Sequence, residues 1–326
     1  MLPLTSLRVS PSPARRLPRT VLITGALGHI GSALVPYLFT HNYRVLVVDN
    51  FSTQRYATLL HWSKLGIQVG FTAGDVRDAP LMANLISRAD VVVHLAAVTD
   101  ASTSHEISEI VYDVNTRGTA VAIAELCADL GKPLIFPSTT SVYGVYDGVA
   151  DEDSVLRPQS PYAFSKLNAE VLLRLTPISE LTTILRFGTI YGPSVGMRFH
   201  TAVQKWEIEA VLGRPMVIWT DAYDQKRPYL YLGDACSAIG HVLAHELFGE
   251  TYNVVSGNHT PHEVTDIIKR HRPDARVEFV NHPLLNQYSY TVSGEKFNGT
   301  GFQPQGTIQS GIAETMDALA GIRSIT

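Results

Sequence analysis

Residues 20–31 read TVLITGALGHIG, and this stretch decides the fold of the first half of the chain. A short apolar strand is followed by three glycines: Gly25, Gly28 and Gly31. The first permits a tight turn, the second lets the backbone approach a pyrophosphate, and the third lets the next helix pack on the strand. The amino end of that helix offers free N–H groups to an anion. The stretch therefore predicts a dinucleotide-binding turn, with His29 and Ile30 among its cofactor contacts.

Strand and helix patterns alternate through the rest of this half. Apolar strands are predicted at 19–24, 44–49, 68–72, 90–95, 134–137 and 182–187. Helices are predicted between them, at 32–40, 56–65, 80–88, 108–130 and 161–175. Such alternation implies an α/β fold with a parallel, doubly wound sheet, and nearly continuous apolar strands imply helices on both of its faces.

The regular alternation of predicted strands and helices ends after the sequence Tyr-Gly-Pro at 191–193. Helices are predicted at 198–212, 234–245, 261–270 and 308–320, and short strands at 216–219, 229–232, 252–255 and 277–280. We therefore expect a dinucleotide-binding domain over 20–190 and a smaller, mainly substrate-binding α/β lobe over 191–326.

The first 19 residues contain four prolines and four arginines and lack the continuous apolar core of a secretory signal. We interpret residues 1–19 as a disordered leader, with a transit peptide as the alternative.

Composition excludes several classes of protein. The 326 residues are 45% hydrophobic and 17% charged, which is enough for a sizeable core. A net charge of −4 argues against nucleic acid as a partner, and no apolar run reaches the roughly 18 residues of a membrane span. Cys127 and Cys236 are too few for a disulfide scaffold and fit a reducing cytoplasm. The histidines and cysteines show no metal-ligand spacing, so no metal site is expected.

An acidic residue indicates which dinucleotide binds. Asp49 ends the second predicted strand, about 20 residues past the glycine turn. A carboxylate there accepts hydrogen bonds from ribose hydroxyls and repels a 2′-phosphate, which favours NAD over NADP. Asn50 and Ser52 follow in the same turn and are predicted to contact the cofactor, while Arg55 leaves NADP open.

A second motif carries the chemistry. Tyr162 and Lys166 stand four residues apart on a predicted helix, so they share one face, and Thr139 ends the preceding strand. A phenol with an ordinary pKa near 10 is a poor base at neutral pH, but a neighbouring ammonium and a nicotinamide charge favour its phenolate. We expect Tyr162 to take a proton from a sugar hydroxyl while hydride leaves, with Thr139 holding the substrate oxygen.

Together these segments resemble the extended short-chain dehydrogenase/reductase family, in its NAD-dependent sugar epimerase/dehydratase group. The resemblance runs from about Thr20 to Leu319. Its motifs appear in order as TGALGHIG, VVDN, GDVRD, HLAA, VNTRGT, STTSVYG, SPYAFSK, RFGTIYGP, KRPYLYLGDA and YNVVSG.

The resemblance implies a Rossmann-type domain, a C-terminal lobe for a nucleotide sugar and a homodimer formed through a helical bundle. It makes Thr139, Tyr162 and Lys166 the catalytic triad and gives Tyr143 a structural role. Besides Tyr162 and Lys166, it places six more residues at the cofactor: Asp75, Val76, Leu95, Ala96, Ala97 and Asn115.

Departures from the family pattern narrow the reaction. The 4,6-dehydratases of the family carry Asp-Glu after the catalytic Thr, where this chain has Thr140 and Ser141. Neither hydroxyl can act as the carboxyl acid or base of an elimination. Cys127 has no evident partner for the acid/base pair of a 3,5-epimerase. The favoured interpretation is a C4 epimerase; the alternatives are an NAD(P)-dependent sugar dehydrogenase or reductase, a 4,6-dehydratase, and an NAD-binding regulatory protein without catalysis.

The predicted substrate is a nucleotide-diphosphate sugar. Arg227 matches the family's phosphate-binding arginine, although pairing with Asp221 or Asp224 is an alternative role. Thr189 stands where the family commonly has an Asn that contacts the sugar diphosphate. The predicted substrate contacts are Thr99, Thr139, Thr140, Thr189, Arg198 and Arg227.

Overall fold

The computed structural model describes residues 19–99, 108–281 and 290–322, and the structural statements that follow concern those residues. Apart from Arg19, the predicted leader lies outside them. None of the helices in the described part of the chain has the length and apolar character that a membrane crossing needs.

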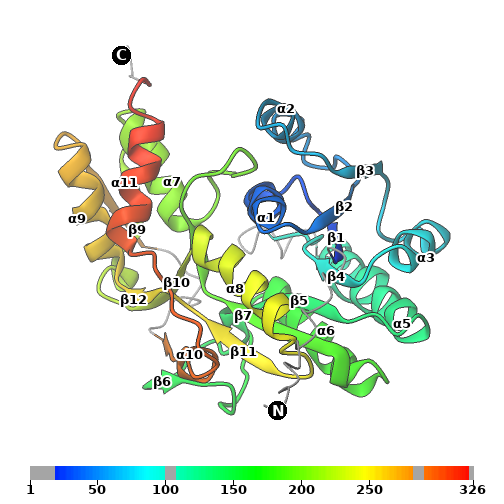
Figure 1. Cartoon of the computed structure of the whole chain (residues 1–326). Coiled ribbons are helices and arrows are strands. Elements are labelled where there is room, and N and C mark those ends of the chain that lie inside the picture. The colour runs from blue at the N-terminus through cyan, green and yellow to red at the C-terminus, as the bar shows by residue number, and fades with distance from the viewer. Residues whose placement is uncertain (1–18, 100–107, 282–289, 323–326) are drawn as a thin grey trace, which may run out of the picture.

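Seven strands form one central parallel sheet in the order β11-β7-β5-β4-β1-β2-β3 (Figure 1). Their bounds are β1 Thr20–Thr24, β2 Arg44–Asp49, β3 Gly70–Ala73, β4 Val91–His94, β5 Leu134–Thr139, β7 Thr182–Phe187 and β11 Thr251–Val254. This architecture confirms the predicted Rossmann-type α/β fold. The strand order reverses between β1 and β4, so a crevice for a ligand is expected at the carboxyl ends of those two strands.

Helices cover both faces of this sheet, which explains the continuous apolar strands. Val91 and Val93 of β4 join the core under one group of helices, and Val92 joins the core under the other. The first group is α1 His29–Thr40, α2 Ala57–Lys64 and α8 Leu232–His245. The second is α3 Ala79–Ser87, α5 Ala122–Asp129 and α6 Pro161–Leu175.

The second half of the chain returns to the central sheet. The strand predicted at 252–255 is β11, which pairs with β7 at the outer edge of the sheet. The helix that precedes it, α8, packs beside α1, and both contribute apolar side chains to one core. The large sheet is therefore completed by residues that follow the end of the regular alternation at 191–193.

The helix predicted at 108–130 is divided into three parts. These are α4 Ser108–Tyr112, a π-helix at Asp113–Val121 and α5. In the π-helix, Thr116 donates a hydrogen bond to the Ser165 carbonyl of α6 at 2.8 Å. A π-helical turn is wider than an α-turn and is frequent at functional sites, which periodicity alone does not reveal.

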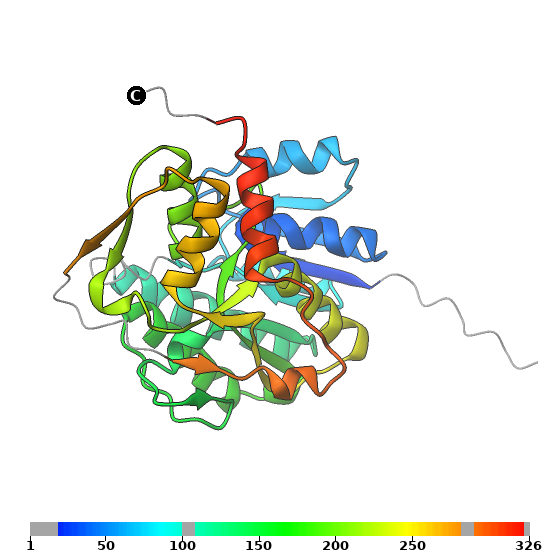
Figure 2. The ribbon, with the colours of Figure 1, turned by 90° about the vertical axis from the view of Figure 1, so that its left-hand side faces the viewer.

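The rest of the second half forms smaller sheets and a helical cluster. A three-stranded sheet contains β8 Thr189–Tyr191, β10 Arg227–Tyr231 and β12 Gly257–His259. Two strand pairs join β9 Met216–Trp219 to β13 Val277–Val280 and β6 Val149–Ala150 to β14 Thr291–Val292. Helices α7 Ala202–Val211, α9 Pro261–His271 and α11 Ile308–Ala318 share a separate apolar core and lie side by side in Figure 2. The short helices are 3-10 turns at Thr140–Val142, Ser179–Leu181 and Thr220–Ala222 and helix α10 Glu295–Asn298.

Candidate active site and cofactor site

The glycine turn between β1 and α1 has the shape that a dinucleotide requires. Gly25 has a φ of +64°, and a Cβ there would lie 2.7 Å from the Ala96 backbone. A Cβ at Gly31 would collide with the Ala26 backbone, so only glycine lets α1 approach β1 this closely. Gly28 caps α1 without a side-chain hydrogen bond, which leaves the amino end of the helix open toward the crevice.

Three predicted cofactor residues meet at the end of β2. The Asp49 carboxylate accepts hydrogen bonds from the Leu27 N–H at 3.0 Å and the Phe51 N–H at 2.9 Å, which ties the glycine turn to β2. Asn50 donates to the Asp75 carboxylate at 3.1 Å, and its own carbonyl accepts from the Ser52 N–H at 3.0 Å. Hydrogen bonds from the neighbouring Arg77 side chain hold the pKa of Asp75 well below its usual range, so this carboxylate stays charged.

The segment after β4 lies against the glycine turn. Leu95, Ala96 and Ala97 are partly buried, and Thr24 of β1 holds them through Oγ1, which accepts from the Ala96 N–H at 3.2 Å. Val76 is buried in the core beneath α3 and α5. Leu95, Ala96 and Ala97 are thus positioned at the switch point of the sheet, whereas Val76 belongs to the core near β3.

Asn115 links the segment after β4 to helix α6 through hydrogen bonds. Its Oδ1 accepts from the Val98 N–H at 2.8 Å, and its Nδ2 donates to the Val98 carbonyl at 2.9 Å and to Ser165 Oγ at 3.1 Å. These contacts give the predicted cofactor residue a positioning role, because both ends of its amide are engaged by the protein.

The predicted catalytic residues converge at the carboxyl end of β5. Ser160 caps α6 by accepting a hydrogen bond from the Ala163 N–H at 3.2 Å, and Pro161 is the first residue of the helix. Together they fix the position of Tyr162 in the first turn. Thr139 ends β5, and its side chain lies near enough to the Tyr162 hydroxyl to favour a lower pKa of that phenol. The structure therefore brings a phenol and a threonine hydroxyl together at one point.

Lys166 lies one turn along α6 and is only 5% exposed. Its Nζ donates to the Pro137 carbonyl at 2.7 Å and lies 4.3 Å from the centroid of the Phe136 ring. Burial lowers the pKa of Lys166 to about 8, while the Glu170 carboxylate acts in the opposite direction.

The pKa of Tyr162 differs from the sequence expectation. Burial raises it to about 12, with the Thr139 side chain opposing that rise. Lys166 points to the Pro137 carbonyl instead. The expected lowering by this ammonium is therefore not seen, and Tyr162 needs a further positive charge nearby before it can act as a base at neutral pH.

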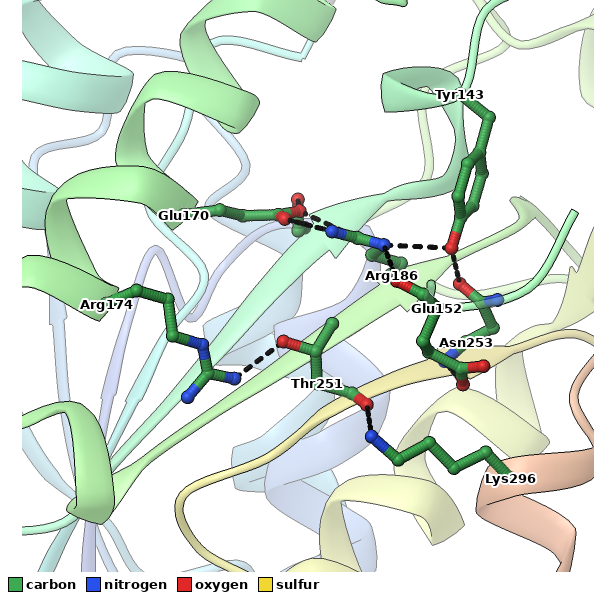
Figure 3. A network of polar contacts seen from close by, with 9 residues as sticks. Tyr143, Glu152, Glu170, Arg174, Arg186, Thr251, Asn253 and Lys296 are labelled. Atoms are coloured by element: carbon green, nitrogen blue, oxygen red, sulfur yellow. Dashed lines mark hydrogen bonds and ion pairs between the residues drawn. The ribbon is translucent and has the colours of Figure 1, made fainter. Parts of the chain in front are cut away.

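A buried polar network joins α6 to strands β5, β7 and β11 (Figure 3). Tyr143 is fully buried; its hydroxyl donates to Asn253 at 2.8 Å and accepts from Arg186 at 2.9 Å. Arg186 of β7 pairs with Glu170 of α6, and Ser138 of β5 also donates to Glu170. Tyr143 thus has the structural role that the family resemblance implies.

The predicted substrate residues fall into three groups. Thr139 and Thr140 lie at the end of β5, where Thr140 is buried. Thr99 accepts a hydrogen bond from Arg198 Nη2 at 2.7 Å, next to the glycine turn. The third group is Thr189 of β8 and Arg227 of β10, on neighbouring parallel strands.

One guanidinium nitrogen of Arg227 is available to bind a ligand. Its guanidinium lies 5.3 Å from the centroid of the Tyr290 ring. Its buried Nη2 has no hydrogen-bond partner among residues 19–99, 108–281 and 290–322. No ion pair joins it to Asp221 or Asp224, both of which are described, so the surface-pairing alternative is not what the structure shows.

Sequence reasoning missed two residues of the site, His94 and Glu170. His94 Nδ1 lies 2.7 Å from Thr24 Oγ1, and burial lowers its pKa to about 3, so it is neutral beside the charged Lys166. The position of His94 in HLAA marks it as part of a motif. Glu170 lies four residues after Lys166 on the same helix, and that spacing is the signal that could have found it.

Comparisons with known proteins agree with this geometry. The family model described as the NAD dependent epimerase/dehydratase family matches residues 21–255. The low-salt glycan biosynthesis protein Agl12 of Haloferax volcanii is 29% identical over 311 residues, covering 92% of this chain and 98% of that protein.

Two solved structures extend the likeness. A UDP-glucose 4-epimerase from Thermus thermophilus in complex with NAD has a TM-score of 0.80 and 28% identity, covering 93% of this chain and 99% of that one. DesIV, a dTDP-glucose 4,6-dehydratase from Streptomyces venezuelae with NAD bound, has a TM-score of 0.82 and 27% identity, covering 91% and 96%. Because the family model spans most of the length, the chain belongs to the NAD-dependent epimerase/dehydratase family of enzymes.

Proposed function

We propose that this enzyme is a nucleotide-sugar epimerase that inverts C4 through transient oxidation to a 4-keto sugar. The observation that carries the proposal is the identity of the residues after Thr139. Thr140 and Ser141 form the turn that follows β5, and Ser141 N–H donates to Thr139 Oγ1 at 3.1 Å. Both positions carry hydroxyls, whereas elimination of water requires a carboxyl acid or base.

The chain's own residues hold and move one proton in this reaction. Thr139 Oγ1 orients the C4 hydroxyl of the sugar, and Tyr162 removes its proton through the phenolate oxygen. The nicotinamide ring of bound NAD would add to the charge of Lys166 the further positive charge that Tyr162 needs in order to act as a base. Bound NAD would supply reversible hydride exchange at C4, and Tyr162 would return the proton to the C4 oxygen of the inverted sugar, so that cofactor and enzyme end the cycle unchanged.

The sugar diphosphate fits between the two halves of the chain. Arg227 offers a buried nitrogen without a partner among the described residues, and a guanidinium matches a diphosphate through paired hydrogen bonds. Thr189 lies on the adjacent strand. We assign cofactor binding mainly to residues 20–190 and substrate binding mainly to residues 191–326.

A homodimer is part of the proposal. Helices α4 and α6 pack against each other and carry large apolar side chains that are 45–79% exposed: Ile110, Tyr112, Phe164, Val171 and Leu175. An exposed apolar face across two neighbouring helices suits a bundle with a second copy. Light scattering of the wild type and of Phe164→Asp tests this, with a dimer that becomes a monomer as the expected result. We place the enzyme in the cytoplasm because Cys127 and Cys236 are both free and buried.

The reaction is tested on the protein as purified. Bound nucleotide is released with acid and identified by mass, and the same preparation is incubated with UDP-, GDP-, CDP- and dTDP-hexoses without added cofactor. We expect retained NAD and a C4-inverted product in the NMR spectrum of one substrate. An empty site that turns over only with added NAD(P) would identify a dehydrogenase or reductase, and no turnover in either condition would favour the regulatory alternative.

Deuterium at C4 of the substrate separates the remaining reactions. An epimerase returns the label to C4, so the product keeps it there. A 4,6-dehydratase moves the label to C6 with loss of water, and a net oxidation transfers it to the nucleotide pool. Tyr162→Phe is the matched control, because it keeps the ring and removes the proton acceptor.

A further inference from the structure

Arg55 places its side chain over the centre of the glycine turn. Its Nη1 lies 3.4 Å from the point where a Cβ on Gly28 would stand. The side chain is half-buried and makes no hydrogen bond or ion pair with any residue in the described ranges. A partly buried guanidinium that lies over a phosphate-binding turn has its donors available to an anion.

A loop from the other half of the chain is fastened to the same turn. His29 Nε2 lies 2.9 Å from the Gly192 carbonyl oxygen, and Gly196 N–H donates to Ser32 Oγ at 3.1 Å. A side chain at Gly196 would collide with the carbonyl oxygens of Leu27 and Gly28, so glycine is needed for this approach. The loop at 192–200 therefore has a defined position against the start of α1.

Arg198 extends from this loop to the segment that follows β4. Its Nη2 donates to Thr99 Oγ1 at 2.7 Å, just past the carboxyl end of β4. Since β4 lies beside β1 in the sheet, Thr99 anchors Arg198 at the switch point. The two arginines thus come from opposite halves of the chain, Arg55 beside Gly28 and Arg198 beside Thr99.

The charges of the two arginines act on each other and on His29. Burial and then the charge of Arg198 lower the pKa of Arg55 to about 10, with Asp49 opposing. Burial, with smaller contributions from the charges of Arg55, His200 and Arg198, lowers the pKa of His29 to about 4 against the hydrogen bond to Gly192, so His29 is neutral. Two guanidiniums and the amino end of α1 therefore concentrate positive charge over Gly28.

We propose that Arg55 and Arg198 form a clamp that holds the pyrophosphate of the cofactor from both halves of the chain. Guanidiniums bind phosphate oxygens through paired hydrogen bonds, and the turn beneath them leaves room for a pyrophosphate to approach the backbone. The clamp would add to the retention of NAD. The inference rests on NAD as the cofactor and holds for any sugar reaction, so a failed epimerase assay leaves it standing.

Nucleotide affinities test the clamp without any turnover. Arg55→Gln and Arg198→Gln are stripped of nucleotide and titrated by calorimetry with NAD, ADP-ribose, NADP and UDP. We expect the Kd for NAD and for ADP-ribose to rise about 10-fold for each substitution, because a hydrogen bond to a charged group is lost. The Kd for NADP should rise by the same factor, and the Kd for UDP should stay within twofold.

Other patterns would overturn the assignment. A loss confined to UDP would place these arginines at the substrate diphosphate, and a loss confined to NADP would place Arg55 at a 2′-phosphate. Unchanged affinities would show that there is no clamp. Arg44→Gln is the matched control, because Arg44 is exposed and pairs with Thr20 at the opposite end of the strands.

A second variant guards against misfolding. Thr99→Val removes the anchor of Arg198 and keeps both charges, so we expect a smaller rise in the Kd for NAD than Arg198→Gln produces. The apo variants should unfold at the wild-type temperature. An equal rise for Thr99→Val and for Arg44→Gln would contradict the clamp.

Discussion

Glu170 and Arg186 form a buried ion pair, with 2.8 Å between the Glu170 Oε2 and the Arg186 Nη2. The pair joins α6, which carries the catalytic residues, to β7 of the central sheet, and Tyr143 and Asn253 extend it toward β11 (Figure 3). Glu170 also stands one turn from Lys166. A single carboxylate therefore holds the catalytic helix in place and acts on the charge of the catalytic lysine.

Breaking this pair should destabilise the fold. Glu170→Gln keeps the shape of the side chain and leaves the Arg186 charge buried without its counterion, so we expect the free energy of unfolding to fall by about 3–5 kcal/mol. Urea unfolding measures this change. Glu180→Gln, at an exposed position, should change stability by less than about 0.5 kcal/mol, and equal stabilities of the two variants would contradict the prediction.

The same substitution should change the pH dependence of turnover. Burial lowers the pKa of Lys166 to about 8 and the Glu170 carboxylate holds it up, so loss of the carboxylate lowers this pKa further. If turnover requires the charged lysine, the alkaline limb of kcat moves to lower pH. A profile from pH 6 to 10 distinguishes this from a purely structural effect, which would lower kcat equally at every pH.

His94 should make the protein sensitive to acid. Its pKa is about 3 when folded, because burial and then the Lys166 charge disfavour the proton, and near 6.5 when unfolded. Between these values the unfolded chain binds the extra proton, so stability falls as pH decreases, by up to about 1.4 kcal/mol per pH unit. His94→Asn should reduce the change in the urea unfolding midpoint between pH 6.5 and 4.5. The control His271→Asn, at an exposed position, should leave this pH dependence unchanged.

Tyr162→Phe should abolish turnover and leave NAD binding intact. The ring stays in place at the start of α6, and only the hydroxyl that meets Thr139 is lost. We expect kcat to fall by at least about 100-fold, the lower end of what a general base contributes. Single-turnover kinetics and calorimetric titration with NAD check both parts, and a wild-type rate would remove Tyr162 from the role of base.

Asp49→Ala should weaken NAD binding and improve the relative affinity for NADP. The carboxylate is the expected partner of the ribose hydroxyls and repels a 2′-phosphate. It also accepts the N–H groups of Leu27 and Phe51, so its loss loosens the glycine turn as well. We expect the ratio of the two Kd values to shift about 10-fold toward NADP, against no shift for the exposed Asp129→Ala; an unchanged ratio would exclude Asp49 as the determinant.

Much of the architecture could be predicted from local patterns. The strands at 20–24, 44–49 and 182–187 each have an apolar centre, and the glycine spacing at 25, 28 and 31 implies the turn that the structure shows. The π-helix at Asp113–Val121 could not be predicted, since it depends on side-chain hydrogen bonds from Asn115 and Thr116 to residues outside its own helix. The spacing of Tyr162 and Lys166 on α6 does not reveal that burial raises the pKa of Tyr162 or that Lys166 is directed to the Pro137 carbonyl, because both depend on the surrounding fold.

The sequence by itself determined the Rossmann-type fold and the identity of the residues on α6, because both depend on spacing within one segment. Only the tertiary structure decided that β11 completes the central sheet, that Glu170 meets Arg186, and that the loop at 192–200 lies against the start of α1. These contacts join residues far apart in the chain. They depend on the order of strands and on where each crossover returns, and no local periodicity encodes that order.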